Sequence, residues 1–207
     1  MKSILIFMAT FSFFSLLNPA QAQSNYKSVD EAKGLKEGEK APVFVSLDQE
    51  DKLYELEKAL DNGPIVLIFY RGQWCPICNK HLAAIEKDLD QIYEKGATVV
   101  AISPETSGYL KQTMKKTGAS FRLLHDADYK IAEAYDVAFI SDSASLDAYN
   151  NRLGANLKES QSDDSQRLPI PATYIIGQDG IIQWRHFDPD YKKRSSVADI
   201  VAALDKL

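Results

Sequence analysis

Cysteine is scarce in this chain: only two of its 207 residues are Cys, at positions 75 and 78. Two cysteines are too few for the disulfide framework of a small secreted scaffold, and no second CxxC motif or His pair stands at zinc-ligand spacing. The residue after Cys78 is Asn79 rather than the His that covalent haem attachment requires. We therefore expect neither a metal nor a cofactor.

Positive charge is also in short supply. Lys and Arg number 24 against 29 Asp and Glu, so the formal net charge is −5 at pH 7. No basic run is dense enough to follow a nucleic-acid backbone, and we expect no nucleic-acid partner. The chain length predicts one domain with a core large enough to be stable without cross-links.

Long apolar runs are limited to one, Ile4 to Leu17, which follows Lys2. This run is too short and too rich in Ser for a stable membrane span, although an N-terminal anchor is the alternative interpretation. Small residues at Ala20 and Ala22 predict a cleaved export signal over 1–22. We expect an exported protein, periplasmic or secreted. In such an oxidising compartment a close cysteine pair is either a permanent disulfide or a redox couple in use.

The cysteines follow a stretch that predicts a buried strand and then the start of a helix. Ile65 to Tyr70 is a short run of β-branched and aromatic residues, typical of a strand buried on both faces. Pro76 fits best at the first position of a helix, so Cys75 is predicted to be the N-cap. Its sulfur then faces unpaired backbone N–H groups and the positive end of the helix dipole, which stabilise a thiolate. Cys78 falls on the same face one turn later and is predicted to be the resolving partner.

The remaining pattern predicts an α/β domain with a mixed sheet. Apolar residues at three- and four-residue steps indicate one helix of about five turns after the cysteines; they are Leu82, Ile85, Leu89 and Ile92. The strand Ala97–Ser103 follows, so that strand, helix and strand make a parallel βαβ unit. Ala172–Ile176 and Ile181–Phe187 flank a Gln-Asp-Gly turn and predict an antiparallel hairpin.

Three further segments complete the prediction. Residues 24–39 indicate a short exposed helix or an arm that leads to the domain. Residues 141–166, rich in Ser, Asp and Asn, predict a long loop that contains one short helix. Ser196, with Asp199 three residues later, resembles the capping box of a final helix.

Four separated motifs carry a resemblance to a known family. In chain order they are Phe69–Cys78 (FYRGQWCPIC), Ala101–Glu105 (AISPE), Leu168–Ile176 (LPIPATYII) and Asp188–Tyr191 (DPDY). They resemble the peroxiredoxin-like branch of the alkyl hydroperoxide reductase and thiol-specific antioxidant family, within the thioredoxin-fold superfamily. The resemblance implies a thioredoxin-like α/β fold over 38–207, with a mixed central sheet flanked by helices, preceded by an N-terminal extension over 23–37.

The resemblance also implies roles for individual residues. Cys75 stands where these proteins have the peroxidatic cysteine, and Cys78 where thioredoxin-like members have the second thiol. Pro171 matches the cis-proline that faces the pair and exposes the backbone of Ile170 to a sulfur-bound partner. Trp74 is expected to cover one side of the Cys75 thiolate and to shape access to it, besides packing in the core.

The chain departs from ordinary peroxiredoxins at two positions. Those proteins have Thr or Ser three residues before the cysteine and an Arg near the late strand, and here Gly72 and Pro171 stand in those places. We hypothesise that Arg71 supplies charge and hydrogen bonds to a thiolate or a peroxide instead, because a guanidinium donates in a rigid fork. His81 lies nearly two helical turns beyond Cys75, which favours a structural role over that of a base.

These features together predict a thiol-dependent peroxidase. The Cys75 thiolate attacks a hydroperoxide and becomes a sulfenic acid, Cys78 condenses with it, and an external thioredoxin-like dithiol protein reduces the resulting disulfide. Two alternatives stay open. The same pair serves plain thiol–disulfide exchange with protein substrates, which needs no peroxide pocket. A non-enzymatic binding domain with a structural disulfide is the other.

Overall fold

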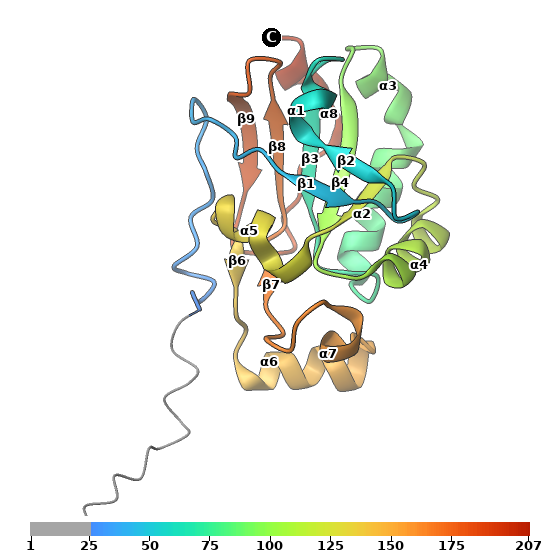
Figure 1. The fold of residues 1–207 in the computed structure, drawn as a ribbon, viewed down its shortest axis with the longest axis vertical. Coiled ribbons are helices and arrows are strands. Elements are labelled where there is room, and N and C mark those ends of the chain that lie inside the picture. Colours follow the sequence, from blue (N-terminus) through green and yellow to red (C-terminus); the bar gives the residue numbers. More distant parts are fainter. Residues whose placement is uncertain (1–25) are drawn as a thin grey trace, which may run out of the picture.

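The computed structural model describes residues 26–207 (Figure 1). The predicted export signal over 1–22 lies outside the described residues and stays a prediction. Among residues 26–207, no helix is both long enough and apolar enough to cross a bilayer.

A five-stranded sheet forms the centre of the domain, in the order β5-β4-β3-β8-β9 (Figure 1). Its strands are β3 (Ile65–Phe69), β4 (Thr98–Ser103), β5 (Arg122–His125), β8 (Ala172–Ile176) and β9 (Ile182–Phe187). β3, β4 and β5 are parallel, whereas β8 is antiparallel to both β3 and β9. Every residue of β3 and β8 is buried, because the apolar sequence of these strands packs on both faces of the sheet. The predicted mixed α/β sheet is confirmed.

Helices flank the sheet, among them α2 (Pro76–Lys87), α3 (Leu89–Tyr93), α4 (Ser107–Thr117) and α8 (Val197–Leu204). The prediction of one helix of five turns after the cysteines is wrong, because the chain leaves the helical conformation at Asp88, with φ −115° and ψ 23°. The predicted apolar stripe is nevertheless buried along its whole length. Since α2 packs against α4 and α3 packs against α8, the break lets one stripe face two partners.

The last helix begins where the sequence predicts. Ser196 Oγ accepts a hydrogen bond from the Asp199 N–H at 3.1 Å, and the Asp199 carboxylate accepts one from the Ser196 N–H at 2.9 Å. These bonds satisfy backbone donors that the start of a helix leaves unpaired. The predicted capping box is confirmed, and it anchors the loop that joins β9 to α8.

The 141–166 insertion is more helical than predicted. It contains α6 (Ser143–Asp147), a π-helical turn η3 (Ala148–Arg152) and α7 (Leu157–Ser160), and Figure 1 shows these elements gathered at one end of the sheet. Local side-chain bonds stabilise these short helices: Asp142 caps α6 by accepting from the Ser145 N–H at 2.9 Å. A two-stranded neck of β6 (Ala138–Phe139) and β7 (Leu168–Pro169) leads into and out of the insertion.

The N-terminal arm, residues 26–39, runs along the domain without forming a helix. The Gly34 N–H donates to the Asp136 carbonyl at 2.9 Å, and Arg185 Nη1 donates to three consecutive arm carbonyls. The arm is therefore bonded both to β9 and to the turn that follows helix α5 (Lys130–Ala134). Of the two forms predicted for this segment, the structure has the arm.

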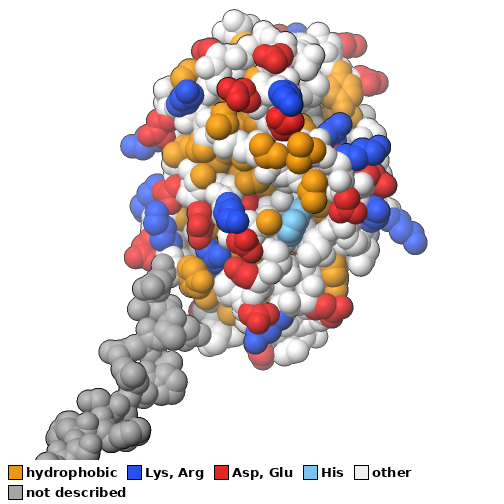
Figure 2. Space-filling model, viewed as in Figure 1, with side chains coloured by type: hydrophobic (Ala, Val, Ile, Leu, Met, Phe, Trp, Pro, Cys, Tyr) orange, Lys and Arg blue, Asp and Glu red, His pale blue; other side chains and the backbone are white. Residues whose placement is uncertain are grey.

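A small hairpin and three short helical elements complete the fold of residues 26–207. They are β1 (Val45–Leu47), β2 (Leu53–Glu55), α1 (Leu56–Leu60), the 3₁₀ turn η2 (Ala127–Tyr129) and α5 (Lys130–Ala134). Figure 2 shows apolar side chains across the middle of this face, and the hairpin region supplies exposed Val43, Val45, Leu47 and Leu53. Acidic and basic side chains are interspersed around them (Figure 2). This face therefore carries no basic stripe of the kind that binds nucleic acid.

Candidate active site

The cysteine pair lies at the start of α2, directly after the central strand β3. Cys75 is the N-cap of the helix, with extended backbone angles (φ −85°, ψ 105°), and Pro76 is the first helical residue. The Cys75 sulfur accepts a hydrogen bond from the Cys78 N–H at 3.3 Å. An orphan amide of the helix start is thus aimed at the sulfur, as the sequence predicts, and it stabilises negative charge there.

Cys75 and Cys78 are joined by a disulfide, with their Cα atoms 5.2 Å apart. Both residues have 0% of their surface exposed. The oxidised pair is therefore sealed from solvent, and a protein partner can reach it only after its cover moves.

Arg71 makes direct contact with the Cys75 sulfur. Its Nη2 donates to Cys75 Sγ at 3.3 Å, and its Nη1 donates to the Tyr149 hydroxyl at 3.3 Å. The guanidinium carbon lies 3.9 Å from the ring centre of Tyr191 and about equally far, 5.1 and 5.2 Å, from those of Trp74 and Tyr149. Burial lowers the pKa of Arg71, although the tyrosines oppose this effect. The structure therefore holds a cation against Cys75 with aromatic faces instead of carboxylates.

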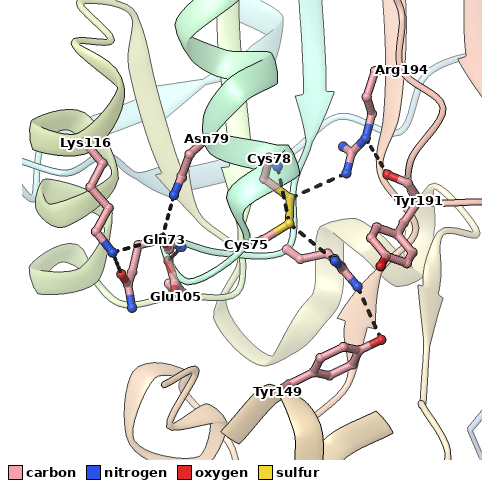
Figure 3. Close-up of a disulfide and its surroundings, with 10 residues drawn as sticks. Gln73, Cys75, Cys78, Asn79, Glu105, Lys116, Tyr149, Tyr191 and Arg194 are labelled. Atoms are coloured by element: carbon pink, nitrogen blue, oxygen red, sulfur yellow. Dashed lines mark hydrogen bonds between the residues drawn. A yellow bond between two sulfur atoms is a disulfide. The ribbon is translucent and has the colours of Figure 1, made fainter. Parts of the chain in front are cut away.

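Aromatic rings form the cover of the pair. Trp74 is buried, and its ring lies 5.0 Å from that of Tyr149, which comes from the 141–166 insertion. Figure 3 shows Tyr149 and Tyr191 on one side of Cys75 and Cys78, with Gln73 and Glu105 on the other. The sequence predicted a covering role for Trp74, and the structure places its ring against Tyr149 and Arg71. The sequence assigned no site role to the two tyrosines, although Tyr191 ends the Asp188–Tyr191 motif, because only the fold brings the insertion and the loop after β9 to this point.

A second guanidinium, which the sequence did not single out, reaches the other sulfur. Arg194 Nη2 lies 3.5 Å from Cys78 Sγ, and Nε donates to the Tyr191 carbonyl at 2.7 Å (Figure 3). In the sequence this arginine simply follows Lys192 and Lys193, which are both exposed. No feature of the local sequence distinguishes the three basic residues. Only the path of the loop after β9 brings Arg194, and not the two lysines, to Cys78.

Glu105, at the end of the Ala101–Glu105 motif, supports the active-site loop from the opposite side. Its Oε2 accepts from the Gln73 N–H at 2.8 Å, and the residue is fully buried. A Cβ added at Gly72 would lie 2.5 Å from Glu105 Oε1 and 2.6 Å from Trp74 Nε1, and Gly72 has a φ of +151°. The threonine or serine of ordinary peroxiredoxins therefore does not fit at Gly72, because Glu105 and Trp74 occupy that space.

Burial raises the pKa of Glu105 to about 8, so the folded protein binds a proton that the unfolded chain releases near pH 4.5. Stability from this proton is full below pH 4.5 and is lost as the pH rises to about 8. The side chain of Glu105→Gln stays neutral at every pH and keeps a hydrogen-bond acceptor. We expect the free energy of unfolding of this variant, relative to that of the wild type, to rise by about 2 to 4 kcal/mol between pH 5 and pH 8.5.

Urea denaturation of both proteins at these two pH values measures the difference. Taking the difference between variant and wild type cancels the titration of His81, which affects both proteins alike. Glu94→Gln, at an exposed carboxylate, is the matched control and should show no such trend. If the difference in unfolding free energy between Glu105→Gln and the wild type is the same at both pH values, Glu105 does not hold a proton in the folded protein.

A cavity of about 320 Å³ lies beside the site. Its lining brings together Arg71, Tyr149, Tyr191, Ile170 and Pro171, together with apolar side chains that include Val29, Phe139, Ile140 and Pro189. Three residues that the sequence proposed for the site, Arg71, Ile170 and Pro171, thus line one cavity. The guanidinium of Arg71 stands between this cavity and the Cys75 sulfur.

The prediction that Pro171 follows a cis peptide bond is wrong. All peptide bonds of residues 26–207 are trans, including that between Ile170 and Pro171. The Ile170 N–H donates to the Val137 carbonyl at 2.7 Å. Trans is the favoured isomer of an X–Pro bond. The Ile170 N–H is therefore already bonded within the chain and is not free to pair with a partner.

His81 is buried in a structural role. Its Nε2 donates to the Ser195 carbonyl at 3.0 Å, and burial together with the nearby Arg194 lowers its pKa to about 4. It is neutral at pH 7, and its bond points to the loop before α8. This geometry agrees with the sequence-based interpretation, which favoured a structural role for His81 over that of a base.

Comparison with known proteins identifies related chains. A family model described as the AhpC/TSA family matches residues 38–185. A chloroplastic peroxiredoxin Q from Suaeda salsa is 26% identical over 83% of this chain and 69% of its own, and other chloroplastic peroxiredoxins Q are matched over 61 to 66% of their length. The thiol-disulfide oxidoreductase ResA of Bacillus subtilis is 30% identical over 51% of this chain and 59% of its own.

Among solved structures, the peroxidoxin BcpB from Mycobacterium tuberculosis has the same fold. It superimposes with a TM-score of 0.65 at 20% identity, covering 84% of this chain and 98% of that structure. The thioredoxin-like architecture predicted from the motifs is confirmed.

Proposed function

This chain belongs to the AhpC/TSA family, and from that membership and the geometry of the site we propose that it is a thiol-dependent peroxidase that reduces hydroperoxides at Cys75. The Cys75 thiolate attacks the terminal oxygen of the hydroperoxide and the O–O bond breaks. The departing oxygen takes a proton and leaves as an alcohol or water. Cys75 is thereby oxidised to a sulfenic acid.

The second half of the cycle regenerates the thiols. The Cys78 thiolate attacks the Cys75 sulfur, the S–O bond breaks, and the hydroxide leaves as water after taking a proton. The product is the Cys75–Cys78 disulfide, which is the state of the pair in this structure. An external dithiol protein of thioredoxin type supplies the two electrons that reduce it, through a mixed disulfide.

The contact between Arg71 and Cys75 carries the proposal. A guanidinium 3.3 Å from the sulfur, buried and without a carboxylate partner among residues 26–207, favours a thiolate and also donates to oxygen atoms of a bound peroxide. It borders a cavity of about 320 Å³, which is large enough for a small hydroperoxide. Arg71 thus stands in for the Thr and Arg that ordinary peroxiredoxins have.

Thiol–disulfide exchange with protein substrates is the second candidate. The 30% identity to the thiol-disulfide oxidoreductase ResA favours it, as does the CxxC spacing, which that chemistry requires. Burial of the pair does not separate the two candidates, because a protein reductant and a protein disulfide both have to contact the Cys75 sulfur. Exchange explains neither the AhpC/TSA membership nor the cavity of about 320 Å³ beside Arg71, which a hydroperoxide can occupy. We therefore place peroxide reduction first.

A direct comparison of oxidants tests both candidates. The fully reduced protein is mixed with hydrogen peroxide, with tert-butyl hydroperoxide and with an oxidised protein disulfide, and free thiols are counted against time. Fast thiol loss with a hydroperoxide, and slow loss with the protein disulfide, is the expected result. Fast loss with the protein disulfide alone would move the assignment to exchange, and loss with none of them would leave a binding domain with a structural disulfide.

We also propose that the protein is exported, which the order of charged, apolar and small residues over 1–22 supports. Its reductant would then act outside the cytoplasm. The N-terminal sequence of the mature protein is the measurement, and Gln23 is the expected first residue. A mature chain that still begins with Met1 would contradict export by cleavage.

A further inference from the structure

The burial of Cys78 is at odds with the part it has in the proposed cycle. The residue has 0% of its surface exposed and lies inside the first turn of α2. Apolar burial raises the pKa of a thiol, whereas attack on the Cys75 sulfenic acid requires a thiolate. Cys75 has the helix start and Arg71 to stabilise its negative charge. Cys78 needs a stabilising group of its own.

Arg194 has the position to be that group. Its Nη2 is 3.5 Å from Cys78 Sγ, and its Nε donates to the Tyr191 carbonyl at 2.7 Å (Figure 3). Its Nη1 is buried and has no hydrogen-bond partner within residues 26–207. In that part of the chain Arg194 forms no ion pair with a carboxylate either. A cation with no anionic partner therefore faces the sulfur.

The loop that carries Arg194 is held in place on both sides. The Ser195 carbonyl accepts from His81 Nε2, one turn beyond Cys78 on the same helix, and Ser195 Oγ lies 2.9 Å from Thr173 Oγ1 of β8. Ser196 starts the capping box of α8. The guanidinium is thus positioned by the fold and does not swing freely as an exposed arginine would.

The other charged groups near Cys78 do not replace this contact. On α2, His81 is neutral at pH 7, and Cys75 carries no charge once it is a sulfenic acid. Arg71 is directed to Cys75 and Tyr149, and Glu105 bonds the Gln73 amide on the far side of the pair. Tyr191 offers its carbonyl to Arg194 and its ring to Arg71. Each sulfur therefore has one guanidinium of its own.

We propose that Arg194 is the charge partner of Cys78, which it keeps as a thiolate so that Cys78 can attack the Cys75 sulfenic acid. The inference rests on the proposed peroxidase cycle. In this step the S–S bond forms as the S–O bond breaks, hydroxide leaves with one added proton as water, and Cys78 is oxidised while the Cys75 sulfur is reduced. Arg194 donates no proton to the reaction; its positive charge stabilises the attacking anion.

A titration in a single-thiol background tests the contact without any peroxide. In Cys75→Ser, the absorbance of the thiolate near 240 nm against pH reports Cys78 alone. Adding Arg194→Met is expected to raise the Cys78 pKa by about one to three units, as loss of a close opposite charge does. Arg194→Lys should retain part of the effect, and Lys193→Met, which removes an exposed neighbouring charge, should change nothing. The same Cys78 pKa with and without Arg194 would overturn the proposal.

A kinetic measurement separates this proposal from the proposed function. With one equivalent of hydrogen peroxide, Arg194→Met should slow the conversion of sulfenic acid to disulfide at least tenfold more than it slows peroxide consumption. Sulfenic acid trapped with dimedone should therefore accumulate. Equal slowing of both steps would overturn a specific role at Cys78. If the wild-type protein consumes no peroxide, the peroxidase assignment fails, and the titration alone then supports or overturns the Arg194–Cys78 contact.

Discussion

Cys75→Ser is expected to abolish hydroperoxide reduction, with a loss of at least about 10³-fold in the rate of peroxide consumption. A serine hydroxyl at the N-cap still accepts the backbone N–H bond that holds the start of α2, so the fold should remain. It is not ionised near neutral pH, so neither Arg71 nor the helix start can make it a nucleophile toward peroxide. Consumption of hydrogen peroxide in the presence of dithiothreitol, followed by its ultraviolet absorbance, measures the effect.

Cys78→Ser is the matched control for this result. The variant should still react once with hydrogen peroxide at a rate within about tenfold of the wild type, and it should stop as a sulfenic acid that dimedone traps. Continued turnover would then depend on an added thiol that replaces Cys78. Peroxide consumption by Cys75→Ser at a rate near that of the wild type would show that Cys75 is not the reacting sulfur.

Arg71→Met is expected to slow the first reaction of Cys75 with hydrogen peroxide by about 10²-fold. The substitution removes a cation 3.3 Å from the sulfur, and an opposite charge at that range lowers a thiol pKa by about one to three units. Methionine keeps an unbranched apolar chain between the rings of Trp74, Tyr149 and Tyr191. We therefore expect the free energy of unfolding to fall by no more than about 2 kcal/mol.

Two control variants make the Arg71 result specific. Arg71→Lys keeps the charge but not the rigid fork and should recover part of the rate. Lys116 donates to the carbonyl of Gln73, which lies in the same loop as Arg71, and it makes no hydrogen bond to either sulfur. Lys116→Met should therefore leave the reaction of Cys75 with hydrogen peroxide nearly unchanged. Stopped-flow rates of thiol loss, with urea denaturation of each variant, separate reactivity from stability. Equal first-step rates in Arg71→Met and the wild type would remove Arg71 from the mechanism.

Local signals in the sequence correctly predicted the strand before the cysteines and the starts of helices α2 and α8. Pro76 restricts its own backbone angle and lacks an N–H group, so it selects the first turn of α2 whatever surrounds it. The apolar run after Gly63 predicts the buried strand β3, and the Ser196–Asp199 capping box predicts the start of α8. These features depend on residues a few positions apart, which is why one sequence is enough to recognise them.

Predictions that depend on distant partners were less successful. The break at Asp88 has no local signal, because it arises where α2 and α3 pack against different helices. The 141–166 insertion has few apolar residues, and its short helices depend on side-chain caps such as that of Asp142. The cis form of Pro171 came from the resemblance alone, and the peptide bond before Pro171 is trans.

By itself the sequence determined that a cysteine stands at the start of a helix after a buried strand, with a second cysteine one turn away. Capping and proline geometry are short-range effects, so they survive without knowledge of the fold. Only the tertiary structure decided what surrounds the pair. It brings Tyr149 from the insertion to Arg71 and Arg194 from the loop after β9 to Cys78, and it places Glu105 where a side chain at Gly72 would lie. These contacts join residues 32 to 116 positions apart, and only packing of the whole chain sets them.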